Sequence, residues 1–273
     1  MMKADACMSI GLFYEKLFAG FRLMRDFILN CNIFEIAGAG LAFFGGIYLL
    51  FGILNLILTQ QLLPRWRLGA KLDPRPIGDG QLERELLLSA SSIGIFGVGM
   101  IFPWGLLQLG WAKLAVNPSV LQTLIEILVL VVWNEIHFYA NHWLLHTRWL
   151  RRFHLPHHRS VVTTPWSTYA FHPVEALMLG NVILLPMLVH DFSVYALFSV
   201  PLFSLLFNSI GHSNYDWKTT GHSVFHNASR RHHLHHACFN GNYGFMFPFM
   251  DKLFKTALPA DAADKQINRW RVR

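Results

Sequence analysis

The chain has 273 residues, of which 53% are hydrophobic and 14% charged, and its formal net charge is +7. Long uncharged runs produce this composition, which excludes an ordinary soluble domain and indicates a membrane protein. The basic residues lie beside apolar runs, so the positive-inside rule explains them better than nucleic-acid binding does. The 3 cysteines are isolated from one another, which argues against a disulfide framework or a thiolate zinc site.

The first third of the chain predicts two helices and a polar loop. Residues 9–29 place apolar side chains at helical spacing, as in an amphipathic helix lying on the membrane surface or packed on the protein itself. Residues 36–58 are uncharged and long enough to span a bilayer. The loop 60–85 is polar and contains several prolines and basic residues. We therefore separate residues 1–85 from a main membrane domain, residues 86–273.

The main domain contains further apolar stretches. Residues 86–112 are uncharged, and a third span covers about 115–134. That span carries Glu126, which we expect to pair with a polar neighbour. The runs 176–189 and 192–211 indicate a helical hairpin, because the first is short for a full span. The sequence thus predicts an all-α integral membrane protein with about four or five transmembrane helices and a helical, histidine-rich cytoplasmic cap.

Charge predicts which side of the membrane the histidines face. If the spans alternate, the basic segments 60–85, 141–172 and 212–273 fall on one side, which should be the cytoplasm. The basic residues near the N-terminus would then lie on the opposite side. This conflict leaves open whether residues 36–58 cross the membrane.

All 15 histidines lie between His137 and His236. One block has two histidines at i, i+4, and two further blocks have three at i, i+3, i+4, so each block presents its imidazoles on one helix face. Neutral imidazoles converging on a point are a typical metal ligand set. One metal rarely takes more than four protein ligands, so eight or more histidines imply two metals. Imidazole suits iron, zinc, copper and nickel alike, and isolated histidines such as His137 and His190 are expected to be bystanders.

The histidine motifs resemble those of the fatty acid hydroxylase/sterol desaturase superfamily, which are membrane di-iron oxygenases. The resemblance covers about residues 130–250 and rests on HxxxH, HxxHH and a later HxxHH motif, together with the stretches AFHPVE, FNSIGHSNY and NYG. It implies metal ligands at His142, His146, His154, His157, His158, His212, His232, His235 and His236. It also implies catalytic roles at the margin of the site for His172 and Asn208.

The chain departs from the family pattern at a few positions. Glu135 stands where an Asp usually precedes the first motif, and Asn208 stands where some members have a histidine. His222 and His226 form a spare HxxxH pair, which we rank behind His212 as a source of ligands. Acids such as Glu135 and Glu175 are expected to orient the ligand imidazoles through their second ring nitrogen.

The resemblance implies a di-iron centre that uses O2 to hydroxylate a C–H bond of a sterol, a fatty acyl chain or another lipid. Desaturation at the same site is the nearest alternative. The lipid would enter from the bilayer, past an entrance for which the candidates are Trp143, Trp149, Trp166 and Phe171. The chain has no dinucleotide fingerprint or iron–sulfur cysteine set, so we expect a separate electron donor such as a ferredoxin, cytochrome or reductase.

Two non-enzymatic functions compete with this interpretation. A histidine-rich metal transporter would place ionisable ligands along its spans, whereas here the histidines cluster at or beyond the span ends. A structural zinc protein would have one closed site with four ligands. For location, the lack of a dilysine or similar tail favours a multi-pass protein of a bacterial inner membrane over the endoplasmic reticulum.

Overall fold

The computed structural model describes residues 19–217, 224–259, 262 and 265. Residues 9–18 of the expected amphipathic helix and His222 lie outside these residues, as does the side chain of His226. Residues 19–30 are helical. The described chain is built from helices, and its only strands are the two-residue β1 (Ala70–Lys71) and β2 (Tyr215–Asp216), which pair antiparallel. The prediction of an all-α protein is confirmed.

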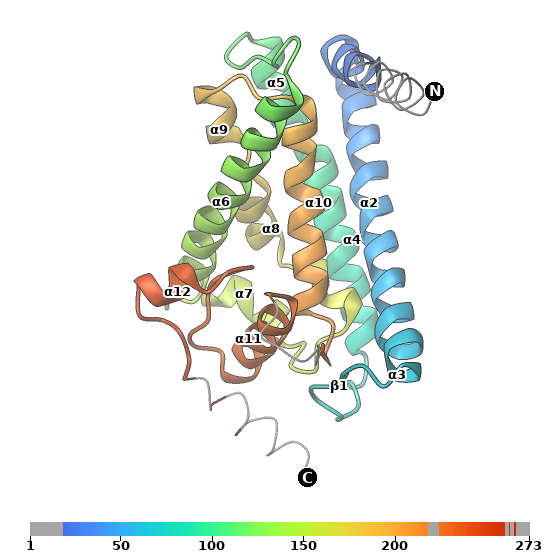
Figure 1. Ribbon diagram of the computed structural model, residues 1–273, viewed down its shortest axis with the longest axis vertical. Coiled ribbons are helices and arrows are strands. Elements are labelled where there is room, and N and C mark those ends of the chain that lie inside the picture. Colours follow the sequence, from blue (N-terminus) through green and yellow to red (C-terminus); the bar gives the residue numbers. More distant parts are fainter. Residues whose placement is uncertain (1–18, 218–223, 260–261, 263–264, 266–273) are drawn as a thin grey trace, which may run out of the picture.

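Within the described residues, four helical segments are long and apolar enough to cross a bilayer (Figure 1). The first, Ile33–Arg65, joins α2 (Ile33–Ile57) to a π-helical turn η1 (Leu58–Leu62) and α3 (Leu63–Arg65). The second joins α4 (Gln81–Gly99) and α5 (Ile101–Gln108); the others are α6 (Val120–Leu145) and α10 (Val194–Gly211). The predicted number of spans is therefore confirmed, and residues 36–58 form a helix of spanning length.

The hairpin expected over 176–211 has one short and one long limb. Its first limb is broken into α8 (Pro173–Gly180) and α9 (Leu184–Val189), and α10 is the return limb. At the tip, Glu126 accepts hydrogen bonds from the backbone N–H of Ser193 at 2.7 Å and from Gln122 at 2.8 Å, and it pairs with His190. These are the polar neighbours that the sequence led us to expect for this acid.

Three of the spans have their N-termini at the same end of the molecule, and each N-terminus is capped by a side chain. The side chains of Asn32, Ser119 and Ser193 accept hydrogen bonds from the first backbone N–H groups of α2, α6 and α10. Asn32 and Glu35 form a reciprocal capping box. These caps satisfy donors that a helix terminus would otherwise leave unpaired.

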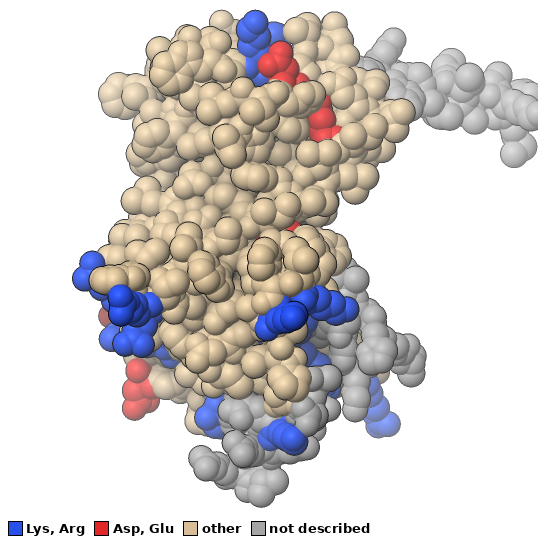
Figure 2. Space-filling model, turned by 90° about the vertical axis from the view of Figure 1, so that its left-hand side faces the viewer, with Lys and Arg blue, Asp and Glu red and all other residues tan. Residues whose placement is uncertain are grey.

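The spans expose apolar side chains in a pattern suited to lipid. On α6 the exposed residues recur along one helix face: Leu121, Leu124, Ile125, Leu128, Val129, Val132 and Ile136. A stripe of this size would be unfavourable in water, and hydrocarbon solvates it without cost. Figure 2 shows a broad uncharged band across this side of the molecule. Most of the Lys and Arg residues visible there lie on the lower half of the molecule, below the band.

Short elements form a cap at the lower end of the spans in Figure 1. The cap contains α7 (Arg151–His158), the 3-10 helix η2 (Pro165–Tyr169), α11 (Val224–Cys238) and α12 (Phe249–Leu253). The β1–β2 pair joins the loop after α3 to the chain that follows α10. The cap therefore receives the ends of α6 and α10, where the first histidines and His212 are located. The division at residue 85 stays a prediction, although α2 packs closely against α4 and α10.

Candidate metal centre

The described part of the chain gathers nine histidines into two groups, each able to hold a metal ion. In each group one ring nitrogen per histidine lies within 4.8 Å of all the others. The first group is His142, His146, His154, His158 and His235; the second is His157, His212, His232 and His236. These are the nine histidines that the sequence motifs single out as ligand candidates.

Four elements supply the imidazoles. His142 lies in the last turn of α6, and His146 is the C-cap residue of that helix. His212 is the C-cap residue of α10. The two remaining blocks, on α7 and α11, each divide between the groups. On α7, His154 and His158 join the first group and His157 the second; on α11, His235 joins the first and His232 and His236 the second. The i, i+3, i+4 spacing therefore lets one short helix serve two neighbouring centres.

Hydrogen bonds assign the proton to Nδ1 in four of these rings. Nδ1 of His142 and of His235 donates to the carbonyl oxygens of Tyr243 and Gly241, each at 2.8 Å. Nδ1 of His212 donates to the carbonyl of Asn208 at 2.9 Å. Nδ1 of His154 donates to the Glu175 carboxylate at 2.7 Å. Since a neutral imidazole carries one proton, Nε2 of each ring presents a bare lone pair to its group.

The Nε2 atoms of these rings point towards one another, and no proton lies between them to form a hydrogen bond. Nε2 of His142 lies 3.1 Å from Nε2 of His154, although both rings carry their proton on Nδ1. Nε2 of His235 is buried and has no partner among the described atoms, and neither ring nitrogen of His146 has one. Facing lone pairs and orphaned acceptors are unfavourable unless a cation lies among them. The donor set therefore fits a metal ion in each group.

Burial keeps the rings in the form that binds a metal. It lowers the pKa of His212 to about 4, and it holds the pKa of His235 and His154 well below the usual histidine range. Neighbouring imidazoles lower these pKa values further. The charged form is disfavoured because it loses hydration. The rings are consequently neutral near pH 7 and keep a free lone pair.

The two acids expected to orient imidazoles have different roles. Glu175 does so, through His154. The expectation for Glu135 is wrong: this fully buried carboxylate accepts from the backbone N–H groups of Met246, at 2.6 Å, and Phe247. It pins the segment after the last histidines to α6, because those two amides have no helical partner there.

The sequence also suggested Asn208 and His172 as residues at the margin of the site, and neither belongs to the two histidine groups. Asn208 holds His212 through its carbonyl, and its side chain donates to the carbonyl of Thr168 at 2.7 Å. The ring of His172 caps α8 by accepting from the N–H of Val174, and this residue belongs to neither group. His137 is held by Asn181, away from both groups.

Sequence reasoning did not assign a role to two backbone carbonyls, those of Gly241 and Tyr243. They set the orientation of two ligand candidates. The neighbouring NYG stretch is visible in the sequence, but a carbonyl has no residue-type signature, so only the fold reveals this function.

An apolar cavity of about 340 Å³ lies among the spans, and the nine grouped histidines are not among its lining residues. Phe171 and Phe138 line the cavity, and their ring centroids lie 5.0 Å from those of His157 and His142 respectively, so one aromatic residue separates the cavity from each histidine group. Asn208 also lines it. Its volume lies in the range of small-molecule sites. Its wall is largely Phe, Leu, Ile and Val contributed by the spans.

Of the four aromatic residues considered for a lipid entrance, only Phe171 lines this cavity. Trp143 and Trp149 are exposed at the surface, and Trp149 lies beneath the guanidinium of Arg148. Trp166 packs instead against Tyr48. The two exposed tryptophans have the position expected of an interfacial aromatic belt.

Residues 127–256 match the family described as fatty acid hydroxylase. The chain is 28% identical over 184 residues to the Delta(7)-sterol 5(6)-desaturase of Candida glabrata, an alignment that covers 63% of this chain and 48% of that protein. It is 30% identical over 152 residues to the Delta(7)-sterol 5(6)-desaturase of Gibberella zeae, covering 53% and 42%. It is 32% identical over 143 residues to methylsterol monooxygenase 1 of Danio rerio, covering 51% and 46%.

The chain thus spans a little under half the length of these relatives. No solved structure matches it. The matched segment contains both histidine groups and the carbonyls that orient them. The motifs, the gathered histidines and the relatives agree, and residues 127–256 of the chain belong to the fatty acid hydroxylase/sterol desaturase superfamily.

Proposed function

We propose that this protein is a membrane-embedded di-iron oxygenase that oxidises a C–H bond of a lipid, with hydroxylation as its main reaction. One observation carries the proposal: two groups of neutral, converging imidazoles lie directly behind Phe171 and Phe138, which line an apolar cavity. A site of this kind combines metal ligands, a lipid-sized apolar space and exclusion of water.

The nine histidines are the proposed iron ligands. The chemistry that a bound di-iron centre supplies is activation of O2 and removal of hydrogen from an unactivated C–H bond. The protein's own part is to hold nine lone pairs in place. The carbonyls of Tyr243, Gly241 and Asn208 and the carboxylate of Glu175 fix the ring orientation, which is the usual role of groups behind a metal ligand.

The substrate is proposed to be a lipid that lies in the cavity with its reactive carbon next to the histidine groups. The relatives are named as enzymes acting on sterols, which supports a sterol or a similar lipid. Phe171 and Phe138 would contact the lipid on the side of the cavity nearest the histidine groups. Asn208 is the polar group that lines the cavity and also holds His212, so we assign it a positioning role in catalysis. His172 stays a candidate at the margin, through its cap on α8.

Desaturation is the second candidate reaction. Both outcomes begin with removal of a hydrogen atom, and the relatives include a monooxygenase and desaturases by name. A metal-transport function is less well supported, because nothing in the relatives' names suggests it and the ligand candidates cluster in the cap beneath the spans.

The reaction needs two electrons from a separate donor, for which a ferredoxin, a cytochrome or a reductase is the proposed class. We propose that the cap faces the cytoplasm, supported by the Lys and Arg gathered at that end (Figure 2). A basic surface would attract an acidic redox partner. The relatives come from fungi and a fish, so they lend no support to the bacterial inner membrane that the sequence favoured.

The direct test uses the detergent-purified protein. We expect two irons per chain and, with a reductase system and O2, a lipid product heavier by one oxygen atom. A product lighter by two hydrogens would assign desaturation instead. One redox-inert metal per chain and an unchanged lipid extract would refute the proposal.

A further inference from the structure

Two of the proposed ligands depend on one short stretch of backbone. His142 on α6 and His235 on α11 each donate from Nδ1 to a carbonyl at 2.8 Å, the first to Tyr243 and the second to Gly241. Both carbonyls belong to residues 241–244. The direction of two imidazoles from two helices is therefore set by the path of four residues.

This stretch lies outside regular secondary structure. Gly241 has φ +83° and Asn242 has φ +54°, a left-handed conformation that is uncommon for a residue with a side chain. No strand ladder holds this path, and the backbone N–H of Asn242 donates to the carbonyl of Thr256 at 2.9 Å. Asn242 contributes one anchor, since its side-chain oxygen accepts from the N–H of Leu258 at 2.9 Å. The main anchor is a carboxylate.

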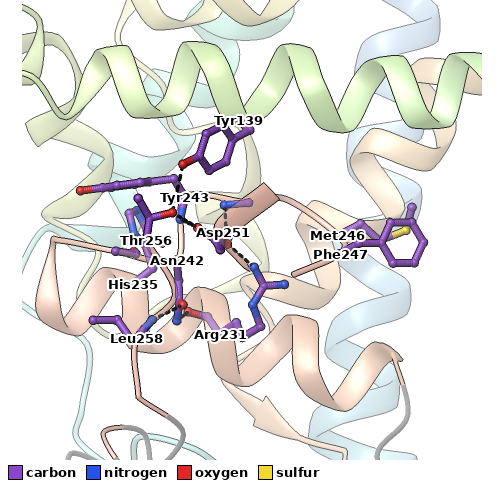
Figure 3. A network of polar contacts seen from close by, with 12 residues as sticks. Tyr139, Arg231, His235, Asn242, Tyr243, Met246, Phe247, Asp251, Thr256 and Leu258 are labelled. Atoms are coloured by element: carbon purple, nitrogen blue, oxygen red, sulfur yellow. Dashed lines mark hydrogen bonds and ion pairs between the residues drawn. The ribbon is translucent and has the colours of Figure 1, made fainter. Parts of the chain in front are cut away.

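Asp251, on α12, is completely buried beneath the stretch. Its two oxygens accept from the backbone N–H groups of Tyr243 at 2.8 Å and Gly244 at 2.9 Å (Figure 3). The same carboxylate accepts from the hydroxyl of Thr256 at 2.7 Å and pairs with the guanidinium of Arg231 on α11. It thus ties the stretch to the helix that carries His235.

The fit around this carboxylate is close. A Cβ on Gly244 would lie 2.6 Å from one carboxylate oxygen of Asp251 and 3.0 Å from the guanidinium of Arg231. Only glycine lets the amide of residue 244 reach the carboxylate. The stretch therefore has little freedom to move while Asp251 stays in place.

We propose that Asp251 is a positioning residue for the first metal site. Its carboxylate receives the amides of the stretch, so that the carbonyls of Gly241 and Tyr243 face His235 and His142 and keep the proton of each ring on Nδ1. This inference rests on the proposed function, because it treats the first histidine group as a metal site. No hydrogen bond among the described residues joins either imidazole to Asp251 itself.

The second group provides an internal contrast. His212 donates from Nδ1 to the carbonyl of Asn208 in its own helix, α10. No hydrogen bond among the described residues joins the stretch 241–244 to the second group. Disturbing Asp251 should consequently weaken one metal site and spare the other.

The test is a metal titration of the purified full chain. Metal-depleted protein in detergent is titrated with Co²⁺ and followed by its visible absorption, which reports each cobalt bound to imidazole. The variant is Asp251→Asn, which keeps the shape and removes the charge. The matched control is Asp73→Asn, since Asp73 is an equally buried aspartate paired with an arginine, Arg75, at 2.6 Å.

We expect two tight equivalents for the wild type and for Asp73→Asn. Asp251→Asn should keep one equivalent at wild-type affinity and bind the other about 10–100-fold more weakly, the usual effect of losing a group behind a ligand. Two unchanged equivalents in Asp251→Asn would overturn the inference, and so would equal weakening of both. A loss of one equivalent in Asp73→Asn would also overturn it.

A second variant covers the case in which Asp251→Asn fails to fold. Gly244→Ala pushes the stretch away from an intact carboxylate and should weaken the same single equivalent; two unchanged equivalents would overturn the inference. Failure of the proposed function is separately visible, because the wild type would then not bind two metals.

Discussion

At the residue scale, the site depends on which nitrogen of each imidazole carries the proton. Three backbone carbonyls and one carboxylate settle this for His142, His235, His212 and His154. Each hydrogen bond both orients the ring and leaves a lone pair pointing into the group. Hydrogen bonding at the second ring nitrogen is therefore as important to this centre as the ligand atoms themselves.

Two histidines of α11, His233 and His235, allow a proposed metal ligand to be compared with a bystander. His235 belongs to the first group, while His233 is equally buried but belongs to neither. We predict that His235→Gln lowers iron content from two to one per chain and abolishes lipid oxidation, because one metal loses a ligand and its partner iron can no longer share the reaction. His233→Gln should keep two irons.

The measurement is elemental analysis of both purified variants, with oxygen-dependent product analysis beside it. Full activity in His235→Gln, or loss of iron in His233→Gln, would contradict the assignment.

Residue type predicted which histidines gather together, but it did not predict which groups hold their rings in place. The nine histidines stand out in the sequence because i, i+3 and i+4 spacings place imidazoles on one helix face. The expectation for Glu135 failed because a buried carboxylate can accept from any nearby donor, and the closest donors proved to be the amides of Met246 and Phe247. The role of Asp251 has no local signature, since it acts through carbonyls several residues away.

At the element scale, helix packing is set by glycines in two of the spans. A Cβ on Gly97 of α4 would lie 2.7 Å from the backbone N of Leu41, and one on Gly40 of α2 would lie 2.4 Å from the carbonyl oxygen of Gly97. Small residues let membrane helices approach backbone to backbone. A Cβ on Gly94, one turn earlier on α4, would meet nothing within 4 Å.

We therefore predict opposite effects for two similar substitutions. Gly97→Ala should lower the thermal unfolding midpoint, because α2 and α4 are forced apart. Gly94→Ala should keep or raise it, since alanine favours a helix by about 1 kcal/mol over glycine. Thermal unfolding in detergent, followed by circular dichroism, distinguishes the two. Equal midpoints for both variants would show that this contact has no effect on stability.

Helix α10 forms one wall of the cavity. Ser204 lines it two turns before His212, whereas Leu202 of the same helix is exposed and does not line it. We predict that Ser204→Phe fills the cavity and reduces lipid oxidation at least about tenfold, while iron stays at two per chain. Leu202→Phe, which adds the same ring on the outer face, should keep both iron and activity.

Product formation and metal content are measured on the same preparations. Unchanged oxidation in Ser204→Phe would mean that the lipid binds elsewhere. Loss of iron in this variant would mean that the ring disturbs the ligands rather than the substrate.

At the scale of the whole molecule, charge and exposed thiols allow the orientation to be measured. Cys238 is exposed in the cap, and Lys113 is exposed at the opposite end of the spans. With Cys7 and Cys31 replaced by serine, we predict that a membrane-impermeant maleimide labels Cys238 only after the cells are permeabilised. Lys113→Cys, in a chain with Cys238→Ser, should be labelled in intact cells. The reverse pattern would place the cap outside the cytoplasm.

The amino-acid sequence was enough to predict the class of the protein. Uncharged runs of about 20 residues can satisfy their backbone in lipid only as helices, so apolar length and charge predicted the four spans, and histidine spacing predicted the ligand candidates. The tertiary structure was needed to divide the nine histidines into two groups, since α7 and α11 each contribute to both. It also decided that carbonyls from residues 241–244, held by Asp251, orient the first group. These features depend on contacts between segments distant in the chain, and a local pattern of residue types carries no information about them.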